Sequence, residues 1–276
     1  MPATQFKILS TNYLPGETSN RLIIEIGDHH LSCAVSNEGH SQVVAFEMFT
    51  FDAEEASDLE ATFSTIKTQS QILSNAFSSV DIVVNNGLSV LVPAYKFNKE
   101  ISDDYLRLAL GDGGAHLKVF DKLECDPAIV NVYRLPINWN DVLLKHYEIR
   151  SASHIYTKIV QAALDTNKAN ETIYIQFYHS HFIVCALRQQ VLLFIQSFSY
   201  DAPEDVVYML LNITQQLELA RPLVRVSGMI ELQSNLYREM QKYFSNIEVE
   251  VLGEGQAIEQ EQHPAHYFTP FSKLVS

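Results

Sequence analysis

The chain has 276 residues, of which 47% are hydrophobic, so it can bury one large core or the cores of two ordinary domains. The formal net charge is −14 and no segment concentrates Lys or Arg, which argues against nucleic acid and anionic membrane surfaces as partners. No apolar run approaches the roughly 20 residues that span a bilayer, and the polar residues 1–17 do not resemble a signal peptide.

The cysteines indicate a reducing compartment. Cys33, Cys125 and Cys185 lie far apart, and the first and last of them fall inside apolar strand patterns. Buried, inert thiols are the expected interpretation of such positions. We therefore expect a cytoplasmic protein.

The first part of the chain predicts a strand meander followed by a helix. Residues 1–20 lack periodicity and predict an irregular arm. Apolar runs at residues 22–27, 31–35 and 43–51, with short connections, predict three antiparallel strands. Asp52 is expected to cap a long helix whose apolar stripe is Leu59, Phe63, Ile66, Leu73 and Phe77.

Residues 80–164 alternate between strand and helix patterns. Asn86-Gly87 separates the apolar runs 80–84 and 88–92 and predicts a tight hairpin. The glycine-rich residues 111–114 follow a predicted helix at 103–110, and we interpret them as a helix stop, because a phosphate loop would precede its helix. The remaining predicted elements are strands at 116–120, 129–133 and 148–150 and helices at 139–147 and 154–164.

A polar stretch at residues 166–171 marks the predicted boundary between a first lobe, residues 1–168, and a second lobe, residues 169–276. The second lobe has the order β-β-β-α-β-α-β, with strands at 172–176, 182–187, 191–198, 223–227 and 247–252 and helices at 203–220 and 231–244. In the tail from residue 253, the aromatic residues are expected to dock back on the body: Tyr267, Phe268 and Phe271.

The two halves predict an internal duplication, because each begins with three antiparallel strands, a helix and a buried strand. Superposing the second strands sets Leu31 against Phe182, an offset of 151 residues (182 minus 31). The same offset pairs Glu25 with Gln176, Gly27 with Tyr178, and His30 with His181.

Two βββαβαβ units joined by a strand and a helix resemble the actin-like ATPase superfamily, whose members duplicate a ribonuclease H-like fold. The resemblance covers nearly the whole chain, and the strand–glycine–helix segment at Ser227-Gly228 resembles the superfamily's adenosine segment. The chain also resembles an uncharacterised bacterial family of this length and, more distantly, the pilus- and secretion-assembly members. The resemblance implies an α/β protein with two ribonuclease H-like lobes.

The resemblance also implies where a nucleotide would bind. Actin-like ATPases use two hairpin turns, one in each lobe, whose Asp-x-Gly sequences hold the metal and let backbone N–H groups reach the phosphates. Here the first turn has Glu25 and Gly27, whereas the second has an amide and an aromatic ring, which suit neither a divalent ion nor a phosphate. If a nucleotide binds, the implied site residues are Glu25, Gly27, Gln176, Tyr178, Ser227 and Gly228.

We therefore expect a degenerate member that needs no cofactor: a non-catalytic scaffold or regulatory module that binds another protein through the interdomain cleft or an exposed sheet edge. The alternative is a divergent ATPase or kinase that binds ATP with Mg²⁺ in the interdomain cleft, with Glu25 as its only metal carboxylate. No Gly-x-Ser-x-Gly elbow, Walker loop, HExxH or CxxC motif supports another enzyme class.

The histidines of the two turns offer a further hypothesis. In the implied fold the two turns face each other, and imidazoles are common ligands of zinc and other transition metals. The simpler interpretation is that they are solvated hairpin residues, because no obvious acid beyond Glu25 or Asp28 completes a site. The candidate metal ligands are His29, His30, His179 and His181.

Overall fold

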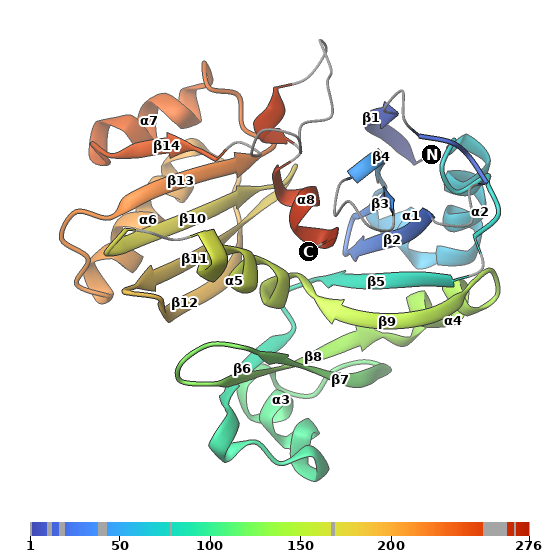
Figure 1. Cartoon of the computed structure of the whole chain (residues 1–276), viewed down its shortest axis with the longest axis horizontal. Coiled ribbons are helices and arrows are strands. Elements are labelled where there is room, and N and C mark those ends of the chain that lie inside the picture. Colours follow the sequence, from blue (N-terminus) through green and yellow to red (C-terminus); the bar gives the residue numbers. More distant parts are fainter. Residues whose placement is uncertain are drawn as a thin grey trace. The chain divides into compact units, whose positions relative to one another are not determined.

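The computed structural model describes residues 2–9, 13–16, 20–37, 43–77, 79–166, 169–250, 264–267 and 269–275. Its contacts divide the chain into two compact units, each with its own sheet and core (Figure 1). The first unit comprises Met1–Leu123, Ala128–Lys158 and Leu274–Ser276, and the second comprises Glu124–Pro127 and Ile159–Lys273. This division falls within helix α5 (Ile155–Thr166), whereas the sequence places the boundary at residue 168.

A six-stranded sheet forms the centre of the first unit. Its order is β1 (Ala3–Leu9), β4 (Val43–Thr50), β3 (His30–Asn37), β2 (Asn20–Gly27), β5 (Ser79–Asn85) and β9 (Glu148–His154). Strands β2, β3 and β4 form the predicted antiparallel meander, and β5 and β9 run parallel to β2. The predicted irregular arm is wrong, because β1 pairs antiparallel with the outer edge of β4, where the ammonium of Lys7 lies 3.1 Å from the carboxylate of Glu47.

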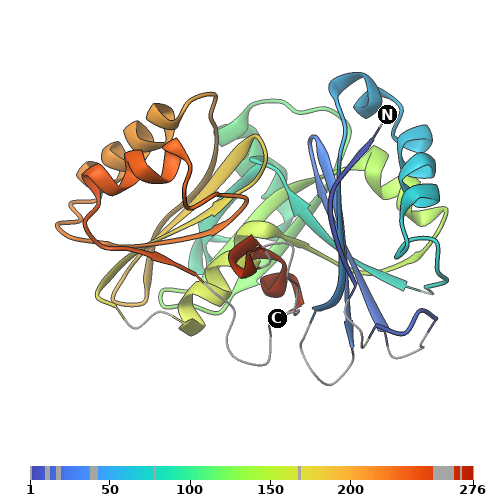
Figure 2. The same ribbon diagram turned by 90° about the horizontal axis from the view of Figure 1, so that it is seen from above.

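Two helices replace the long helix predicted after Asp52. Asp52 does cap α1 (Ala53–Ser57), but the carboxylate of Asp58 then accepts the N–H of Ala61 and starts α2 (Leu59–Gln69). The buried carboxylate of Glu47 accepts the N–H groups of the residues that follow α2, which ends the helix before Leu73. Helices α2 and α4 (Ile137–Leu144) cover one face of the sheet, with their buried side chains in its core (Figure 2).

A smaller sheet is inserted between β5 and β9 in the first unit. Its order is β6 (Ser89–Pro93), β8 (Ile129–Pro136) and β7 (His116–Leu123), with α3 (Ser102–Leu110) and the 3-10 turns η1 (Ala94–Lys96) and η2 (Lys99–Ile101) alongside. The predicted hairpin at Asn86 is therefore wrong, because β5 and β6 belong to different sheets. Asn86 donates instead to the carbonyl of Arg134 in β8. Helix α3 does stop at Gly111, whose φ is +74°.

The second unit is built on a five-stranded sheet. Its order is β12 (Val191–Ser199), β11 (His181–Arg188), β10 (Glu171–Phe177), β13 (Leu223–Gly228) and β14 (Ile247–Val249), which are the five strands that the sequence predicts. Helices α6 (Pro203–Gln216) and α7 (Asn235–Tyr243) lie on one face of this sheet (Figure 2). The end of the predicted strand at 247–252 lies outside the described residues.

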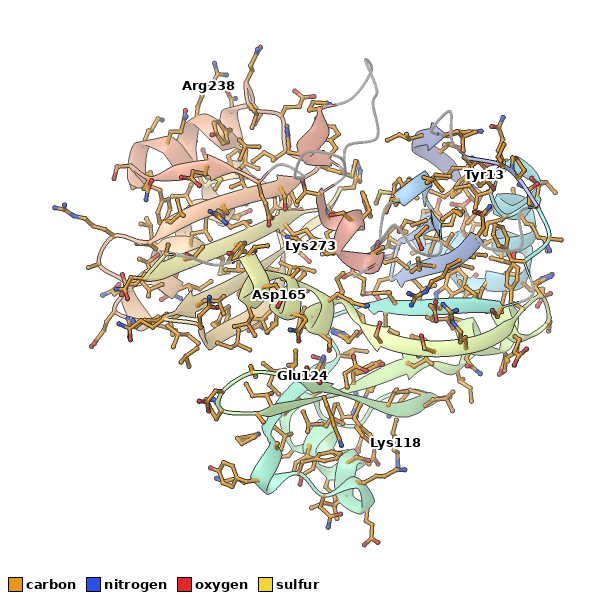
Figure 3. All side chains as sticks on the ribbon, viewed as in Figure 1. Tyr13, Lys118, Glu124, Asp165, Arg238 and Lys273 are labelled. Carbon is orange, nitrogen blue, oxygen red and sulfur yellow. The ribbon has the colours of Figure 1, made fainter. Side chains whose placement is uncertain are left out.

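The tail returns to the body through η3 (Ala265–Tyr267) and α8 (Thr269–Val275). Phe271 is buried, as predicted, while Phe268 lies outside the described residues. Lys273, labelled in Figure 3, places its ammonium 2.7 Å from the carboxylate of Glu250, and both side chains belong to the second unit. No helix within the described ranges combines the length and the apolar character needed to cross a membrane.

The strand registers confirm the duplication. Ile26 pairs with Leu31 across β2 and β3, and Phe177 pairs with Phe182 across β10 and β11, which reproduces the predicted offset of 151 residues. In both units the next strand, β5 or β13, runs parallel to the first one. The two turns implied by the resemblance therefore occupy equivalent places in the two sheets.

Candidate functional site

The first turn buries its carboxylate among hydrogen-bond donors. Residues two apart in a strand share a face, so Glu25 of β2, Ser32 of β3 and Asn85 of β5 meet on one side of the sheet. The carboxylate of Glu25, which is fully buried, accepts hydrogen bonds of 2.7 Å from the Ser32 hydroxyl and of 2.7 Å from the Asn85 amide. Both oxygens of Glu25 are thus engaged by the protein itself.

The imidazole of His30 fills the space beside the glycine of this turn. A Cβ placed on Gly27 would lie 2.1 Å from Cε1 of His30, so any larger residue would displace the ring. The ring is buried, and its Nε2 lies 3.8 Å from Glu25 and 3.4 Å from the Asn85 amide. Gly27 therefore accommodates a side chain of the same unit at the position where the resemblance implies contact with a phosphate.

A small pocket of about 150 Å³ opens beside the first turn. Its lining comes from the first turn, the residue after β5, the end of β8, and helices α1, α2 and α4: Ile26, Gly27, Asp28, Ala56, Leu59, Asn86, Pro136, Asn138 and Trp139. Sites that enclose a drug-sized ligand measure about 300–1,000 Å³. The pocket can therefore take a small group and cannot enclose a whole nucleotide.

The second turn is filled by its own aromatic residue. The phenol oxygen of Tyr178 accepts a 2.6 Å hydrogen bond from the amide nitrogen of Gln176, and both side chains are buried. The ring of Tyr178 also stacks on the imidazole of His181, and its backbone N–H donates to the His181 carbonyl at 2.8 Å. The equivalents of Glu25, Gly27 and His30 thus form one connected cluster.

The strand–glycine–helix segment has a structural reason for its glycine. Gly228 has a φ of +84°, and a Cβ there would lie 2.2 Å from the carbonyl oxygen of Phe177 in β10. The neighbouring Ser227 pairs in register with Gln176. The hydroxyl of Ser227 and the amide oxygen of Gln176 are buried and find no hydrogen-bond partner within the described part of the chain, and such orphaned atoms are sites for an ordered water.

The candidate metal ligands do not share one environment. His29 and His179 are exposed, His30 is buried against Gly27, and His181 stacks on Tyr178. Among the residues whose placement is described, no group of three or more His, Cys, Asp or Glu side chains could hold a metal ion. The four-histidine site draws on both units and stays a prediction.

The groups with the largest pKa shifts are not residues of the two turns. Burial lowers the pKa of His154 to about 3, and burial raises the pKa of Tyr147 and of Cys185 to about 12. The neutral His154 accepts the N–H of Tyr156 at Nδ1, so its Nε2 donates to the carbonyl of Asn86. These groups hold the fold together, whereas an acid–base catalyst would carry its shift into a cleft.

Sequence reasoning missed the residues that occupy the carboxylate of Glu25. Ser32 follows from the register of the first hairpin, because it lies directly opposite Glu25. Asn85 ends the strand parallel to β2, where side chains of adjacent strands converge. Strand alternation is the signal that could have found Ser32, since this polar residue interrupts the apolar run of β3, whereas Asn85 only follows its apolar run.

The comparisons with known proteins agree with this fold. A family profile described as "Protein of unknown function (DUF3822)" matches residues 11–247. No curated protein matches the sequence. A solved Bacteroides thetaiotaomicron protein with actin-like ATPase fold and unknown function is similar at 17% identity and a TM-score of 0.76, over 94% of this chain and 96% of that one.

Two further solved structures are similar over most of their length. A chain of the PilM–PilN type IV pilus biogenesis complex matches at 13% identity and a TM-score of 0.60, over 92% of this chain and 96% of that one. The ethanolamine utilization protein EutJ from Carboxydothermus hydrogenoformans matches at 8% identity and a TM-score of 0.50, over 97% of this chain and 92% of that one. The chain thus has the actin-like ATPase fold of two ribonuclease H-like lobes, which confirms the predicted resemblance.

Proposed function

The chain belongs to the DUF3822 family of proteins of unknown function, and from this premise we propose that it is a non-catalytic actin-like scaffold or regulatory module that binds another protein. The single observation that carries the proposal is the hydrogen bond between Gln176 and Tyr178 in the second turn. A phosphate needs open space and backbone N–H groups at this turn. Here a buried phenol and a neutral amide take that space.

The first turn supports the same proposal. A divalent cation in such a site needs a carboxylate that can turn toward it and its waters. The carboxylate of Glu25 instead accepts hydrogen bonds from Ser32 and Asn85, and the ring of His30 covers Gly27. The residues present in the two turns do not fit a magnesium–phosphate group.

Binding of another protein is supported by the fold and by the charge of the chain. A relative with this fold is found in the PilM–PilN type IV pilus biogenesis complex. The net charge of −14 disfavours nucleic acid as the partner. These observations favour a protein partner, and a tagged chain purified from its native cell should bring down one discrete protein in near-equal amount.

The decisive experiment is calorimetry with ATP and Mg²⁺, combined with an assay for phosphate release. We expect neither heat of binding nor turnover from the wild-type chain. The divergent ATPase or kinase predicts the opposite, namely binding with turnover that is lost in Glu25→Gln, and that result would overturn the proposal. Glu204→Gln is the matched control, because it makes the same change at an exposed position of α6 and leaves both turns unaltered.

A further inference from the structure

Strand β12 lies at one edge of the second unit's sheet. It pairs only with β11, and among the described residues no strand pairs with its outer side. Its nine residues, VLLFIQSFS, contain no charged side chain, no proline and no glycine. Natural edge strands usually carry charged residues or proline, which prevent pairing with a strand of another molecule. An edge strand without them is therefore suited to pair with a further strand.

The first unit shows what covers the equivalent edge. Phe49 of β4 pairs with Leu31, and Phe198 of β12 pairs with Phe182, so β4 and β12 occupy the same place in the duplicated fold. In the first unit, β1 lies antiparallel along the outer edge of β4. This place in the fold therefore accepts an added antiparallel strand, and no described strand occupies it beside β12.

The two edges differ in charge at matching positions. Glu47 of β4 pairs with Cys33, and Gln196 of β12 pairs with Val184, which is the equivalent of Cys33 under the offset of 151 residues. The carboxylate of Glu47 forms an ion pair with the ammonium of Lys7 in β1. Gln196 is neutral and exposed, so the strand that covers β12 needs no charge of either sign.

We propose that β12 pairs antiparallel with β12 of a second copy of this chain, with the two-fold axis at Gln196. In this register Gln196 lies opposite the partner's Gln196, and Phe194 lies opposite the partner's Phe198, which gives two aromatic cross-strand pairs. The three side chains share one face of β12, and the rings of Phe194 and Phe198 are half-buried, with centroids 6.2 Å apart. The axis avoids the irregularity in the β11–β12 pairing, which falls between Ala186 and Leu187, opposite the start of β12.

A second copy fits better than a charged segment of a different protein. Two copies of a chain with a net charge of −14 repel each other at most surfaces, and a strand without charges is a place where they can approach. The β12 sequence can also pair with itself about Gln196, because Phe194 then lies opposite the partner's Phe198, as a two-fold interface requires. A seam of one strand is smaller than the roughly 1,200–2,000 Å² of a stable interface, so the dimer should be reversible.

Sedimentation of the full-length chain over a wide concentration range tests this dimer. We expect a reversible monomer–dimer equilibrium that is lost in Gln196→Lys, which sets two ammonium groups opposite each other across the axis. Gln215→Lys makes the same change of charge at an exposed position of α6 and should leave the equilibrium unchanged. A monomer at every concentration, or a dimer that Gln196→Lys leaves intact, would overturn the proposal.

Cysteine cross-linking tests the register. In a Cys125→Ser background, which leaves only the buried Cys33 and Cys185, Gln196→Cys should form a disulfide-linked dimer under mild oxidation. Ser199→Cys is the control, because Ser199 is also exposed on β12 but would lie opposite Leu193 of the partner rather than opposite itself. Efficient cross-linking at position 199 and none at 196 would contradict this register. Neither experiment contains nucleotide or another protein, so its outcome is independent of the function proposed above.

Discussion

The rings of Tyr178 and His181 stack with their centroids 4.5 Å apart and their planes 5° from parallel. The phenol oxygen of the same tyrosine accepts the amide of Gln176. Tyr178 is therefore held by a ring on one side and a hydrogen bond on the other. The aromatic residue at the glycine position of the turn is therefore a buried and firmly held side chain of the second unit.

Tyr178→Phe should destabilise the protein by about 1–3 kcal/mol, because it leaves the buried amide of Gln176 without its partner. The oxygen of that amide already lacks a partner among the described residues, so the whole polar group would then be unsatisfied. Urea unfolding measures the change. Replacing both partners, as Tyr178→Phe with Gln176→Leu, should recover most of the loss, and Tyr208→Phe at a 65% exposed position is the neutral control.

Asp81→Asn should destabilise the protein by about 2 kcal/mol at neutral pH. Burial of Asp81 opposes its ionisation, but hydrogen bonds from Arg150, Ser151 and Arg21 outweigh burial and lower the pKa of the carboxyl from 3.8 to about 2. Because the folded-state pKa is the lower one, this stabilisation is complete above about pH 4 and is lost as the pH falls toward 2.

The measurement for Asp81 is the difference in unfolding free energy between wild type and variant at a series of pH values. The difference should shrink below pH 4, and a difference that stays constant down to pH 2 would contradict the assignment. Asp141→Asn removes a carboxylate from an exposed position of α4 and serves as the control for net charge.

Gly228→Ala should cost about 2–5 kcal/mol, since the new Cβ meets the carbonyl of Phe177 and the residue keeps a positive φ. The loss should appear in thermal unfolding without any nucleotide present. Gly114→Ala is the matched control, because nothing lies within 4 Å of its Cβ position. If the two variants unfold at the same temperature, the close approach of β13 to β10 is not the reason for this glycine.

Lys273→Met should loosen the C-terminal helix. The side chains of Lys273 and Glu250 are only 8% and 13% exposed, so removing the ammonium leaves a buried carboxylate uncompensated, at a cost of about 3–5 kcal/mol. Limited proteolysis should then cut near α8 sooner than in wild type. Adding Glu250→Gln should restore part of the resistance, whereas Lys242→Met, which breaks an exposed pair, should change little.

The sequence predicts the parts of this fold that depend on local pattern. The succession of strands and helices in the second unit and the offset of 151 residues follow from the apolar runs; the element order confirms the first, and the pairs Ile26–Leu31 and Phe177–Phe182 confirm the second. The crowding of the second turn also follows directly from a tyrosine at a glycine position. Side chains that fill a turn from within the same strand or hairpin can thus be predicted from the sequence.

Features that depend on distant residues escape such reasoning. Strand β1 has no clear alternation, and it forms because β4 offers an edge and Glu47 a partner for Lys7. In the sequence Asn86 is typical of a hairpin, but in the structure its amide donates a hydrogen bond to the carbonyl of Arg134, 48 residues away. The engagement of Glu25 by Asn85 spans 60 residues and has no local signal.

The unequal edges of the two sheets have a consequence for the exchange of backbone hydrogens with deuterated solvent. Among the described strands, β4 has a neighbour on each side and β12 has one, so every second amide of β12 points away from its own sheet. In the isolated monomer these outward amides should exchange quickly while those of β4 stay slow. Uniformly slow exchange along β12 would then indicate that another strand has paired with its outer side.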